Sequence, residues 1–515
     1  MRLALLALLS GASLTLAAAP FEFWPLAWLA PLALLLILDQ QSIARATWLG
    51  WLFGLGLFAS GASWVYVSIH EHGHAPVPLA LLLTGLFVAG LALFFALHAW
   101  IWQRFFARRW VLLSWPALWV VMEIFRSWFL TGFPWLLLGT SQISSPLAGW
   151  APVLGVYGVS ALCVLLGLLL LSLWQPDGLP QSTRLTASSR RWISGASLAS
   201  LLIAGLLLQQ VQWTQPEGDP LKLALVQGNI AQEDKWNPQL RGRIIQQYLR
   251  LSEAAAEQEV DLLLWPETAL PLLPEQAAPF FARALSHAGP ETGLISGLVS
   301  RETSTSAFHN SLITAGGATG VYHKSILVPF GEYVPLERYL RGLIAFFDLP
   351  MSSFQPGSPP GGQLSFAHTQ IAPLICYEIA YADFTARQAQ ESHWLLTVSN
   401  DSWFGASIGP LQHRQIAQMR ALETARPLAR ATNNGVTALI DYQGRITQQL
   451  PQFEEGVLIG QLQPRTGHTP FMLWGSWLAG GISLVLLLIA RLVQRQPPQP
   501  ETADSALPST PKSRS

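Results

Sequence analysis

Cys376, Glu267 and Lys324 each lie in or directly after an apolar, strand-like run, where side chains emerge at the rim of a sheet. A free thiol has an ordinary pKa of about 8.5 and attacks as the thiolate. A carboxylate that accepts its proton and an ammonium that stabilises negative charge would make it competent near neutral pH. The three residue types therefore indicate acyl transfer by Cys376, with Glu267 as general base and Lys324 stabilising the thiolate and then the oxyanion. This chemistry needs no metal and no cofactor.

The runs that carry these residues belong to a segment that alternates between strand-like and helix-like patterns. Apolar strands are expected at 221–227, 260–265, 293–299, 311–315, 321–328, 370–375, 394–398 and 436–441. Helices are expected at 241–257, 274–287 and 412–424. Alternation of buried strands and helices predicts a layered α/β sandwich over residues 213–467.

The rest of the chain has the composition of a membrane protein. Charged residues make up 12% of the 515 residues and apolar residues 51%, whereas soluble proteins carry about 25% charged residues. A spanning helix needs about 20 apolar residues. Such runs lie near 2–19, 21–38, 47–69, 77–102, 110–130, 150–174, 192–212 and 470–492. We therefore expect a seven-span bundle at 1–212, an eighth span at 468–493 and a disordered cytoplasmic tail at 494–515 that is rich in Pro, Ser and Thr.

Arginine in the short connections predicts the orientation, because cytoplasmic loops carry the excess of positive charge. With a cytoplasmic N-terminus, that side receives Arg2, Arg45, Arg104, Arg108, Arg109, Arg184, Arg190, Arg191, Arg491 and Arg495. The α/β domain then faces the periplasm of a bacterium. Residues 1–19 also resemble a cleavable signal peptide, but Pro20 would hinder cleavage and we expect the segment to be retained.

Several other features have structural explanations. The interrupted segment 131–139 is either a short re-entrant segment or an interfacial loop anchored by Trp128 and Trp135. The loop that contains His70, His72 and His74 has no partner cysteines, so we expect it to be solvated rather than to bind a metal. The two cysteines, Cys163 and Cys376, make neither a disulfide scaffold nor a metal framework. The net charge is zero and no basic block is present, so nucleic acid is not an expected partner.

The motifs around the three reactive residues resemble those of a known superfamily. Glu267 in Trp-Pro-Glu-Thr, Lys324 in Tyr-His-Lys and Cys376 in Cys-Tyr-Glu follow the order Glu, Lys, Cys that marks the nitrilase superfamily. Longer motifs resemble the apolipoprotein N-acyltransferase family, and they lie at 226–230, 327–332, 347–354, 399–405 and 408–410.

The resemblance implies a nitrilase-type αββα domain on an eight-span bundle in a bacterial inner membrane. The implied reaction moves an acyl chain from a phospholipid, through a Cys376 thioester, to the N-terminal amine of a diacylglyceryl-cysteine lipoprotein. The enzyme is expected to be a monomer in contact with membrane lipid.

The resemblance also implies roles for residues around the reactive three. Glu332 is the second carboxylate, and it either handles protons or neutralises Lys324. Tyr377 and Glu378 are supporting residues that follow the nucleophile or hold its turn. Trp236 and Trp403 are substrate-binding residues, with packing as the alternative.

Two other functions compete with acyl transfer to an amine. A membrane-tethered nitrilase-type amidohydrolase would use the same three residues with water as acceptor. Such an enzyme needs at most one anchor, whereas lipid donor and lipid-modified acceptor both reside in the bilayer. A transporter would need paired ionisable residues within its spans. Glu123 and Arg126 are almost the only candidates, and they lie near a span end.

The arginine distribution generates a test of topology. A reporter that is active only in the periplasm should be active when fused near Gln355, because that position lies in the domain expected outside the cytoplasm. Fusions of periplasmic and cytoplasmic reporters at the same position measure this directly. Activity of the cytoplasmic reporter there would overturn the orientation.

Overall fold

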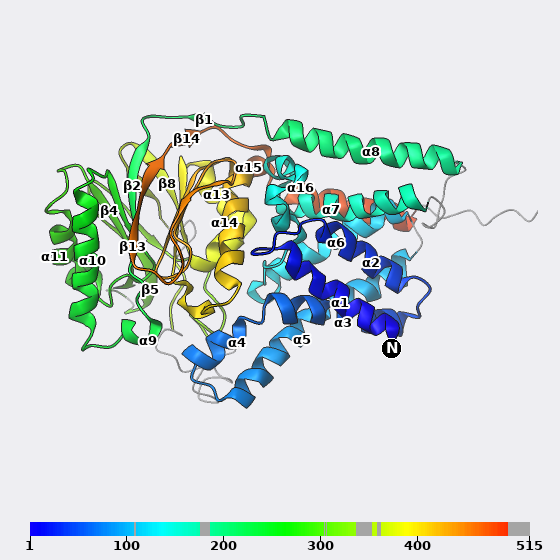
Figure 1. Ribbon diagram of the computed structural model, residues 1–515, viewed down its shortest axis with the longest axis horizontal. Helices are drawn as coiled ribbons and strands as arrows, with labels where there is room; N and C mark the ends of the chain where they lie inside the picture. The colour runs from blue at the N-terminus through cyan, green and yellow to red at the C-terminus, as the bar shows by residue number, and fades with distance from the viewer. Residues whose placement is uncertain are drawn as a thin grey trace, which may run out of the picture.

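A helical bundle and a sheet-containing domain lie side by side in the computed structural model (Figure 1). The structure describes residues 1–107, 110–175, 186–302, 304, 306–335, 353–357 and 362–492. The bundle consists mainly of α1 (Arg2–Ala17), α2 (Leu26–Leu38), α3 (Ile43–Gly61), α5 (Val77–Ile101), α6 (Val111–Trp128), α7 (Ala151–Trp174), α8 (Ala187–Leu208) and α16 (Trp477–Leu492). The expected tail at 494–515 and the motif positions 347–352 lie outside the described residues.

Each apolar run expected from the sequence contains one of these bundle helices in whole or in large part. Four helical segments in the described chain are long and apolar enough to cross a membrane: Ile43–Gly61, Val77–Phe106, Pro146–Trp174 and Ala187–Leu208. Helices α1, α2 and α16 are apolar but shorter. The bundle is thus membrane-associated by length and composition, while eight spans stay a prediction.

Glycines let the first helices of the bundle pack with their backbones in contact. A β-carbon at Gly11 of α1 would lie 1.9 Å from the Phe53 carbonyl oxygen of α3, and one at Gly56 of α3 would lie 2.0 Å from the Leu8 carbonyl oxygen of α1. Lipid is as apolar as leucine, so helices in a membrane associate through such close packing rather than through hydrophobic burial. The glycines therefore determine how closely α1 and α3 approach.

The C-terminal domain contains two six-stranded sheets. The first has the order β13 (Gly456–Leu462), β2 (Leu221–Gln227), β3 (Leu262–Trp265), β4 (Gly293–Arg301), β5 (Phe308–Gly316), β6 (Val321–His323). The second has the order β12 (Ile446–Gln449), β11 (Ala438–Ile440), β10 (Leu428–Thr432), β9 (Trp394–Ser399), β8 (Thr369–Ile375), β7 (Leu364–Phe366). Strands β2, β3 and β4 run parallel, as do β8, β9 and β10. A further pair joins β1 (Gln215–Pro216) to β14 (Arg465–Thr466).

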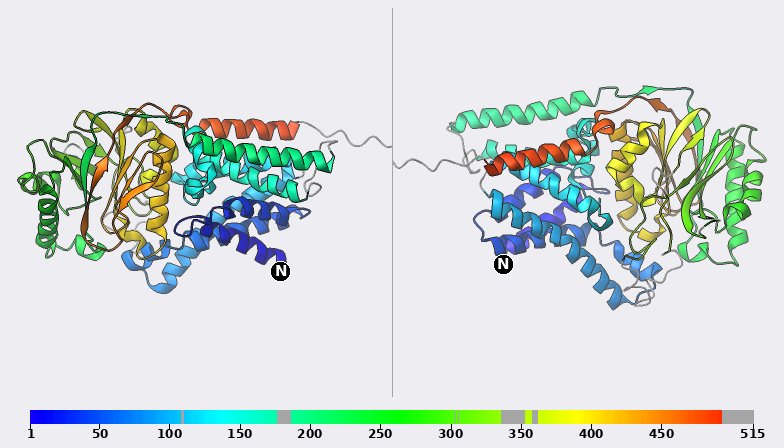
Figure 2. Two further views of the ribbon diagram at one scale, coloured as in Figure 1. Left: turned by 45° about the horizontal axis from the view of Figure 1, so that its top comes forward. Right: turned by 180° about the vertical axis from the view of Figure 1, so that it is seen from behind.

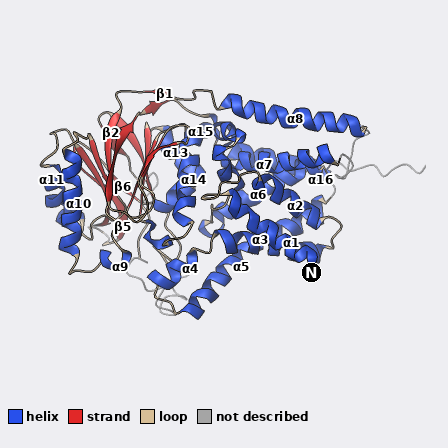
Figure 3. Cartoon of the chain, in the orientation of Figure 1, coloured by secondary structure: helices blue, strands red, loops and turns tan. Residues whose placement is uncertain are grey.

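Helices cover the outer face of each sheet, which gives four layers (Figure 3). Apolar side chains from both sheets, such as Leu225, Leu264, Ile375 and Leu396, form one core between them. Helices α10 (Arg241–Ala256) and α11 (Pro274–Leu285) pack on the first sheet. Helices α13 (Ala382–Gln390) and α14 (Gly409–Thr424) cover the second sheet and share a core cluster with the bundle, which they face in both views of Figure 2. The domain is therefore an αββα sandwich.

The strand predictions are confirmed in part. Strands β2, β4, β5, β8 and β9 cover the expected positions, while the run 321–328 forms a strand only as far as His323. Strands β7, β10, β12 and β13 were not expected. The sequence of β10 is Leu-Ala-Arg-Ala-Thr. An arginine such as Arg430 does not predict a buried strand unless its counter-charge is known. Arg430 is fully buried because the carboxylate of Asp401 lies 2.7 Å away.

The segment between α6 and α7 lies against the sheet domain. Trp135 is 1% exposed and its indole N–H donates to Gln412 of α14 at 2.7 Å, so the expectation that Trp135 anchors an interfacial loop is wrong. Trp128 is 63% exposed. Trp135 is buried because Arg126 donates to the carbonyl oxygens of Phe133 and Trp135 and so holds the segment inside the protein. An aromatic ring thus serves as a contact between bundle and domain.

A second contact between the two bodies occurs inside α7. The helix is interrupted at Gly155, which has φ +67°, and the N–H of Val156 beyond the break has no helical acceptor. The buried carboxylate of Glu423 from α14 accepts from it at 2.6 Å. Burial raises the pKa of Glu423 to about 7, against the lowering effect of Arg420.

The packing of α1 on α3 yields a stability prediction. Gly56→Ala should lower the stability of the folded protein by about 1–3 kcal/mol, because its β-carbon meets a backbone oxygen that cannot rotate away. Gly85→Ala is the matched control, since a β-carbon there has nothing within 4 Å. Thermal unfolding of the two purified variants in the same detergent provides the comparison. Equal midpoints for both variants would contradict close packing of α1 on α3.

Candidate active site

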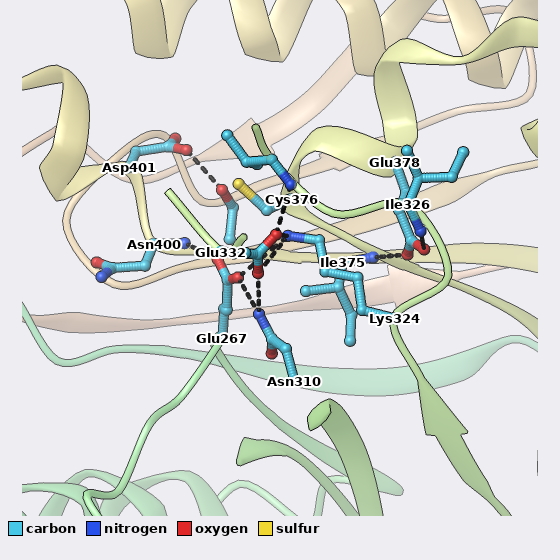
Figure 4. A network of polar contacts seen from close by, with 12 residues as sticks. Glu267, Asn310, Lys324, Ile326, Glu332, Ile375, Cys376, Glu378, Asn400 and Asp401 are labelled. Atoms are coloured by element: carbon cyan, nitrogen blue, oxygen red, sulfur yellow. Dashed lines mark hydrogen bonds and ion pairs between the residues drawn. The ribbon is translucent and has the colours of Figure 1, made fainter. Parts of the chain in front are cut away.

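Glu267, Lys324 and Cys376 converge at one place in the sandwich (Figure 4). Glu267 follows β3 and Lys324 directly follows β6, both in the first sheet, whereas Cys376 directly follows β8 of the second. Lys324 Nζ lies 3.7 Å from Glu267 Oε1, and both side chains are buried. Glu267 and Lys324 also act electrostatically on the Cys376 thiol. The fold therefore brings together all three residues that the sequence singled out.

Cys376 has an unusual backbone conformation. It is the first residue of the turn Cys376–Ala380 and has φ +53°, a region that costs a residue with a β-carbon about 1–2 kcal/mol. Burial raises the pKa of its thiol, the charge of Glu267 raises it further, and Lys324 opposes both without cancelling them. The surroundings of the side chain thus favour the thiol over the thiolate. Its proton has to leave as it attacks.

Lys324 remains an ammonium although it is buried. Burial alone would lower its pKa, but the charges of Glu332 and Glu267 outweigh burial and raise the pKa above its ordinary value. Lys324 Nζ donates to Glu332 Oε1 at 2.9 Å, and the backbone N–H of Val328 donates to Glu332 Oε2 at 2.8 Å. Both oxygens of Glu332 are therefore occupied by donors, which favours the neutralising role over proton handling.

Three residues that the sequence analysis did not assign hold the base. Asn310 donates from Nδ2 to Glu267 at 2.7 Å and to Glu332 at 2.9 Å. The backbone N–H of Asn400 donates to Glu267 Oε2 at 2.7 Å. Lys235 is buried and donates to the Glu267 carbonyl oxygen at 3.2 Å, and burial lowers its pKa to about 8 against the opposing charge of Glu267. Asn400 lies in the motif at 399–405, whereas no motif in the sequence pointed to Asn310 or Lys235 as a site residue.

A glycine makes room for the turn that carries Glu267. A β-carbon at Gly297 of β4 would lie 2.6 Å from the Glu267 α-carbon and 2.6 Å from the Pro266 carbonyl oxygen. The neighbouring strand thus approaches the turn closely only because this position has no side chain.

Glu378 joins the turn of the nucleophile to the loop of the lysine. Its fully buried carboxylate accepts from Tyr322, Ser325, Ile326 and Ile375 at distances of 2.7–3.1 Å. Burial raises the pKa of Glu378 to about 7, while these N–H donors and Lys324 lower it. Since Ile375 precedes the nucleophile and Ser325 follows Lys324, one carboxylate positions both. This geometry supports a structural role for Glu378.

The remaining predicted residues lie around the site rather than in it. Tyr377 donates its hydroxyl to the Gly132 carbonyl oxygen at 3.1 Å, and thereby contacts the bundle. Trp403 lies in a turn whose backbone carbonyl accepts from Ser68 at 2.7 Å, and its ring meets that of His72 edge-on at 5.3 Å. Trp236 is 41% exposed directly after α9 (Gln232–Lys235).

The histidine loop is packed rather than simply solvated. His72 lies 2.8 Å from the Ser402 carbonyl oxygen and His70 lies 2.8 Å from that of Ala75. The expectation of a solvated loop therefore fails for His72, which contacts the domain beside the site, whereas half-buried His70 contacts only its own loop and His74 is exposed.

Two family models match the chain. Residues 222–471 match the carbon–nitrogen hydrolase model, and residues 10–169 match the model of the apolipoprotein N-acyltransferase N-terminal domain. The sheet domain is thus of the carbon–nitrogen hydrolase class. An apolipoprotein N-acyltransferase of Pseudomonas paraeruginosa is 48% identical over 511 residues, covering 96% of each chain, and one of Azotobacter vinelandii is 47% identical over 513 residues with the same coverage. The chain belongs to the apolipoprotein N-acyltransferase family, and it is an acyltransferase.

A solved structure is also similar to part of this chain. An amidase of the nitrilase superfamily from Nesterenkonia is 19% identical, with a TM-score of 0.37, over 50% of this chain and 95% of that one.

Asn310 provides a test of the site geometry. Asn310→Ala removes the donor shared by two carboxylates, so one of them should bind a proton and Glu267 should lose its orientation. We expect alkylation of Cys376 by iodoacetamide at neutral pH to slow about tenfold, equivalent to about 1.4 kcal/mol and within the range for hydrogen bonds to charged groups. Intact-mass kinetics measure the rate, and Cys163, which is fully buried, should stay unlabelled. An unchanged rate would remove Asn310 from the site.

Proposed function

We propose that this protein transfers an acyl chain from a phospholipid to the N-terminal amine of a diacylglyceryl-cysteine lipoprotein. The observation that carries the proposal is the cluster of Cys376, Glu267 and Lys324 in a domain that packs directly on a bundle of apolar helices. The names of relatives that match nearly the whole chain support the same reaction. Donor and acceptor both reside in the membrane that such a bundle implies.

The first half of the reaction forms a thioester. Cys376 Sγ attacks the ester carbonyl carbon while Glu267 takes the thiol proton, as the raised pKa of that thiol requires. The oxygen of the tetrahedral intermediate gains a negative charge, which the ammonium of Lys324 stabilises. The carbon–oxygen bond of the ester then breaks, and Glu267 returns its proton to the departing alkoxide of the lysophospholipid.

The second half discharges the thioester to an amine. The unprotonated N-terminal amine of the lipoprotein attacks the thioester carbonyl, again with Lys324 beside the oxyanion. Glu267, now a carboxylate, takes a proton from the attacking nitrogen. The carbon–sulfur bond breaks, an amide forms, and the sulfur of Cys376 recovers a proton from Glu267.

We assign the surrounding residues by the groups they contact. Glu332 keeps Lys324 charged and in place, and Glu378 and Tyr377 hold the turn of the nucleophile. Trp236, which is exposed, and Trp403, which lies beside the loop between α3 and α5, are positioned to contact substrate rather than to exchange protons.

The arginine distribution supports a multi-pass arrangement in a bacterial inner membrane. In that arrangement the catalytic domain at 213–467 faces the periplasm between the bundle at 1–212 and the final helix at 468–493. Exported lipoproteins would reach Cys376 from this side. The protein would act as a monomer, since one chain supplies all the groups of the proposed reaction.

The alternative, an amidohydrolase, differs in its acceptor and is not favoured by the relatives. An amine attacks a thioester far faster than water does, provided that it is unprotonated, and an α-amino group has a pKa of about 8. We therefore expect the Cys376 acyl-enzyme to persist in water and to discharge when a diacylglyceryl-cysteine peptide with a free N-terminus is added.

Intact-mass analysis after incubation with phospholipid follows this thioester. Cys376→Ala should form no hydroxylamine-labile adduct, whereas Cys163→Ala should form it like the native protein. The N-acetylated peptide serves as the control acceptor and should leave the adduct intact. Hydrolysis at one rate with or without the free-amine peptide would identify the protein as a hydrolase.

A further inference from the structure

We propose that His413 is a positioning residue of the nucleophile, whose Nε2–H holds the backbone carbonyl oxygen of Cys376 and so orients the peptide that follows the thiol. His413 lies on α14, is fully buried, and has Nε2 3.1 Å from that oxygen. No part of the proposed proton transfer uses it. The inference rests on the acyl-transfer function proposed above and adds a residue to it.

The contacts of the ring determine its tautomer. A carbonyl oxygen can only accept, so Nε2 must carry the proton. His413 Nδ1 lies 3.1 Å from Arg430 Nη2 and 3.1 Å from Asp401 Oδ1, and Arg430 Nη2 also lies 2.7 Å from Asp401 Oδ2. Arg430 Nη2 has two hydrogens, and it donates one to Asp401 and the other to Nδ1. In a neutral ring the carbonyl oxygen of Cys376 keeps the single proton on Nε2, so Nδ1 accepts from Arg430 rather than donating to Asp401.

The charge of the ring agrees with this assignment. Burial lowers the pKa of His413 and the charge of Arg430 lowers it further, against the opposing effect of Asp401. Asp401 is itself a firm carboxylate, since Arg430 and His413 outweigh its burial and hold its pKa well below the ordinary value. A neutral imidazole between an arginine and a backbone carbonyl therefore needs no further counter-charge.

The hydrogen bond from His413 holds a residue whose backbone conformation is unfavourable. Cys376 has φ +53°, and a residue with a β-carbon keeps such a conformation only when its surroundings hold it. Its carbonyl and the N–H of Tyr377 belong to one planar peptide, so a donor on the carbonyl fixes the direction of that N–H as well. As an early residue of the helical turn, Tyr377 has no carbonyl partner for its N–H within the turn. His413 thus orients both the thiol and the amide beside it.

The same network extends to the general base. Ser399 donates to Asp401 Oδ1 at 2.6 Å, and the intervening Asn400 donates its N–H to Glu267 Oε2 at 2.7 Å. Space for the Asp401 carboxylate comes from Gly435, where a β-carbon would lie 2.1 Å from Oδ2. One short segment, 399–401, therefore positions Glu267 directly and Cys376 through His413.

Two substitutions separate positioning from packing. In His413→Gln the amide nitrogen reaches the place of Nε2, whereas in His413→Asn it reaches only the place of Nδ1. We expect His413→Asn to slow single-turnover acylation of Cys376 by phosphatidylethanolamine in detergent micelles at least tenfold. The half-saturating lipid concentration should change less than twofold. His413→Gln should recover the rate to within about threefold of the native protein.

His393→Asn is the control, because its ring also binds the backbone of the second sheet, accepting the N–H of Gln370 at 2.8 Å, and lies outside this network. It should acylate at the native rate. Native acylation by His413→Asn, or equal loss in His413→Gln and His413→Asn, would overturn the positioning role.

A failure of the proposed function itself is distinguishable, since the native protein would then form no adduct with the phospholipid. In that case alkylation of Cys376 by iodoacetamide tests the same variants without a lipid donor. His413→Asn should react at least tenfold more slowly than His413→Gln, and equal rates would refute the inference.

Discussion

The ammonium of Lys324 buried between two carboxylates is the interaction on which the rest of the site depends. A charge removed from water is tolerated only when its partners and their remaining hydrogen bonds are complete. Glu332 and Glu267 supply the charge, Asn310 donates to Glu267 Oε1, and the N–H of Asn400 donates to Glu267 Oε2. Removal of Lys324 would leave two buried carboxylates without their counter-charge. The site is therefore a single electrostatic unit rather than three separate residues.

This unit can form only where two sheets meet. The first sheet supplies the base and the ammonium, and the second supplies the thiol, so the αββα packing sets the distances between them. Glu378 and His413 then fix the turn of Cys376 from two directions, one through Ile375 and the other through the carbonyl oxygen of Cys376. Rigid positioning of this kind keeps the thiol beside the base that takes its proton as it attacks.

The bundle takes part in this positioning as well as providing contact with lipid. The hydroxyl groups of Tyr377 and Tyr381 donate to the carbonyl oxygens of Gly132 and Thr131, just beyond α6. Trp135 contacts α14, the helix that carries His413. The turn of the nucleophile thus contacts the helical bundle directly, which suits a reaction whose donor and acceptor lie in the bilayer.

The sequence by itself determined the apolar helices, the α/β character of the domain and the three reactive residues, because periodicity, composition and short motifs are local signals. Only the tertiary structure decided the roles of Asn310, Asn400 and His413. These residues lie 43, 133 and 37 positions from the partners they hold. The tertiary structure also decided that Trp135 is buried and that Arg430 can lie in a strand. A polar group inside a protein is recognised as functional only when its partner is known, and these partners come from distant segments that packing brings together.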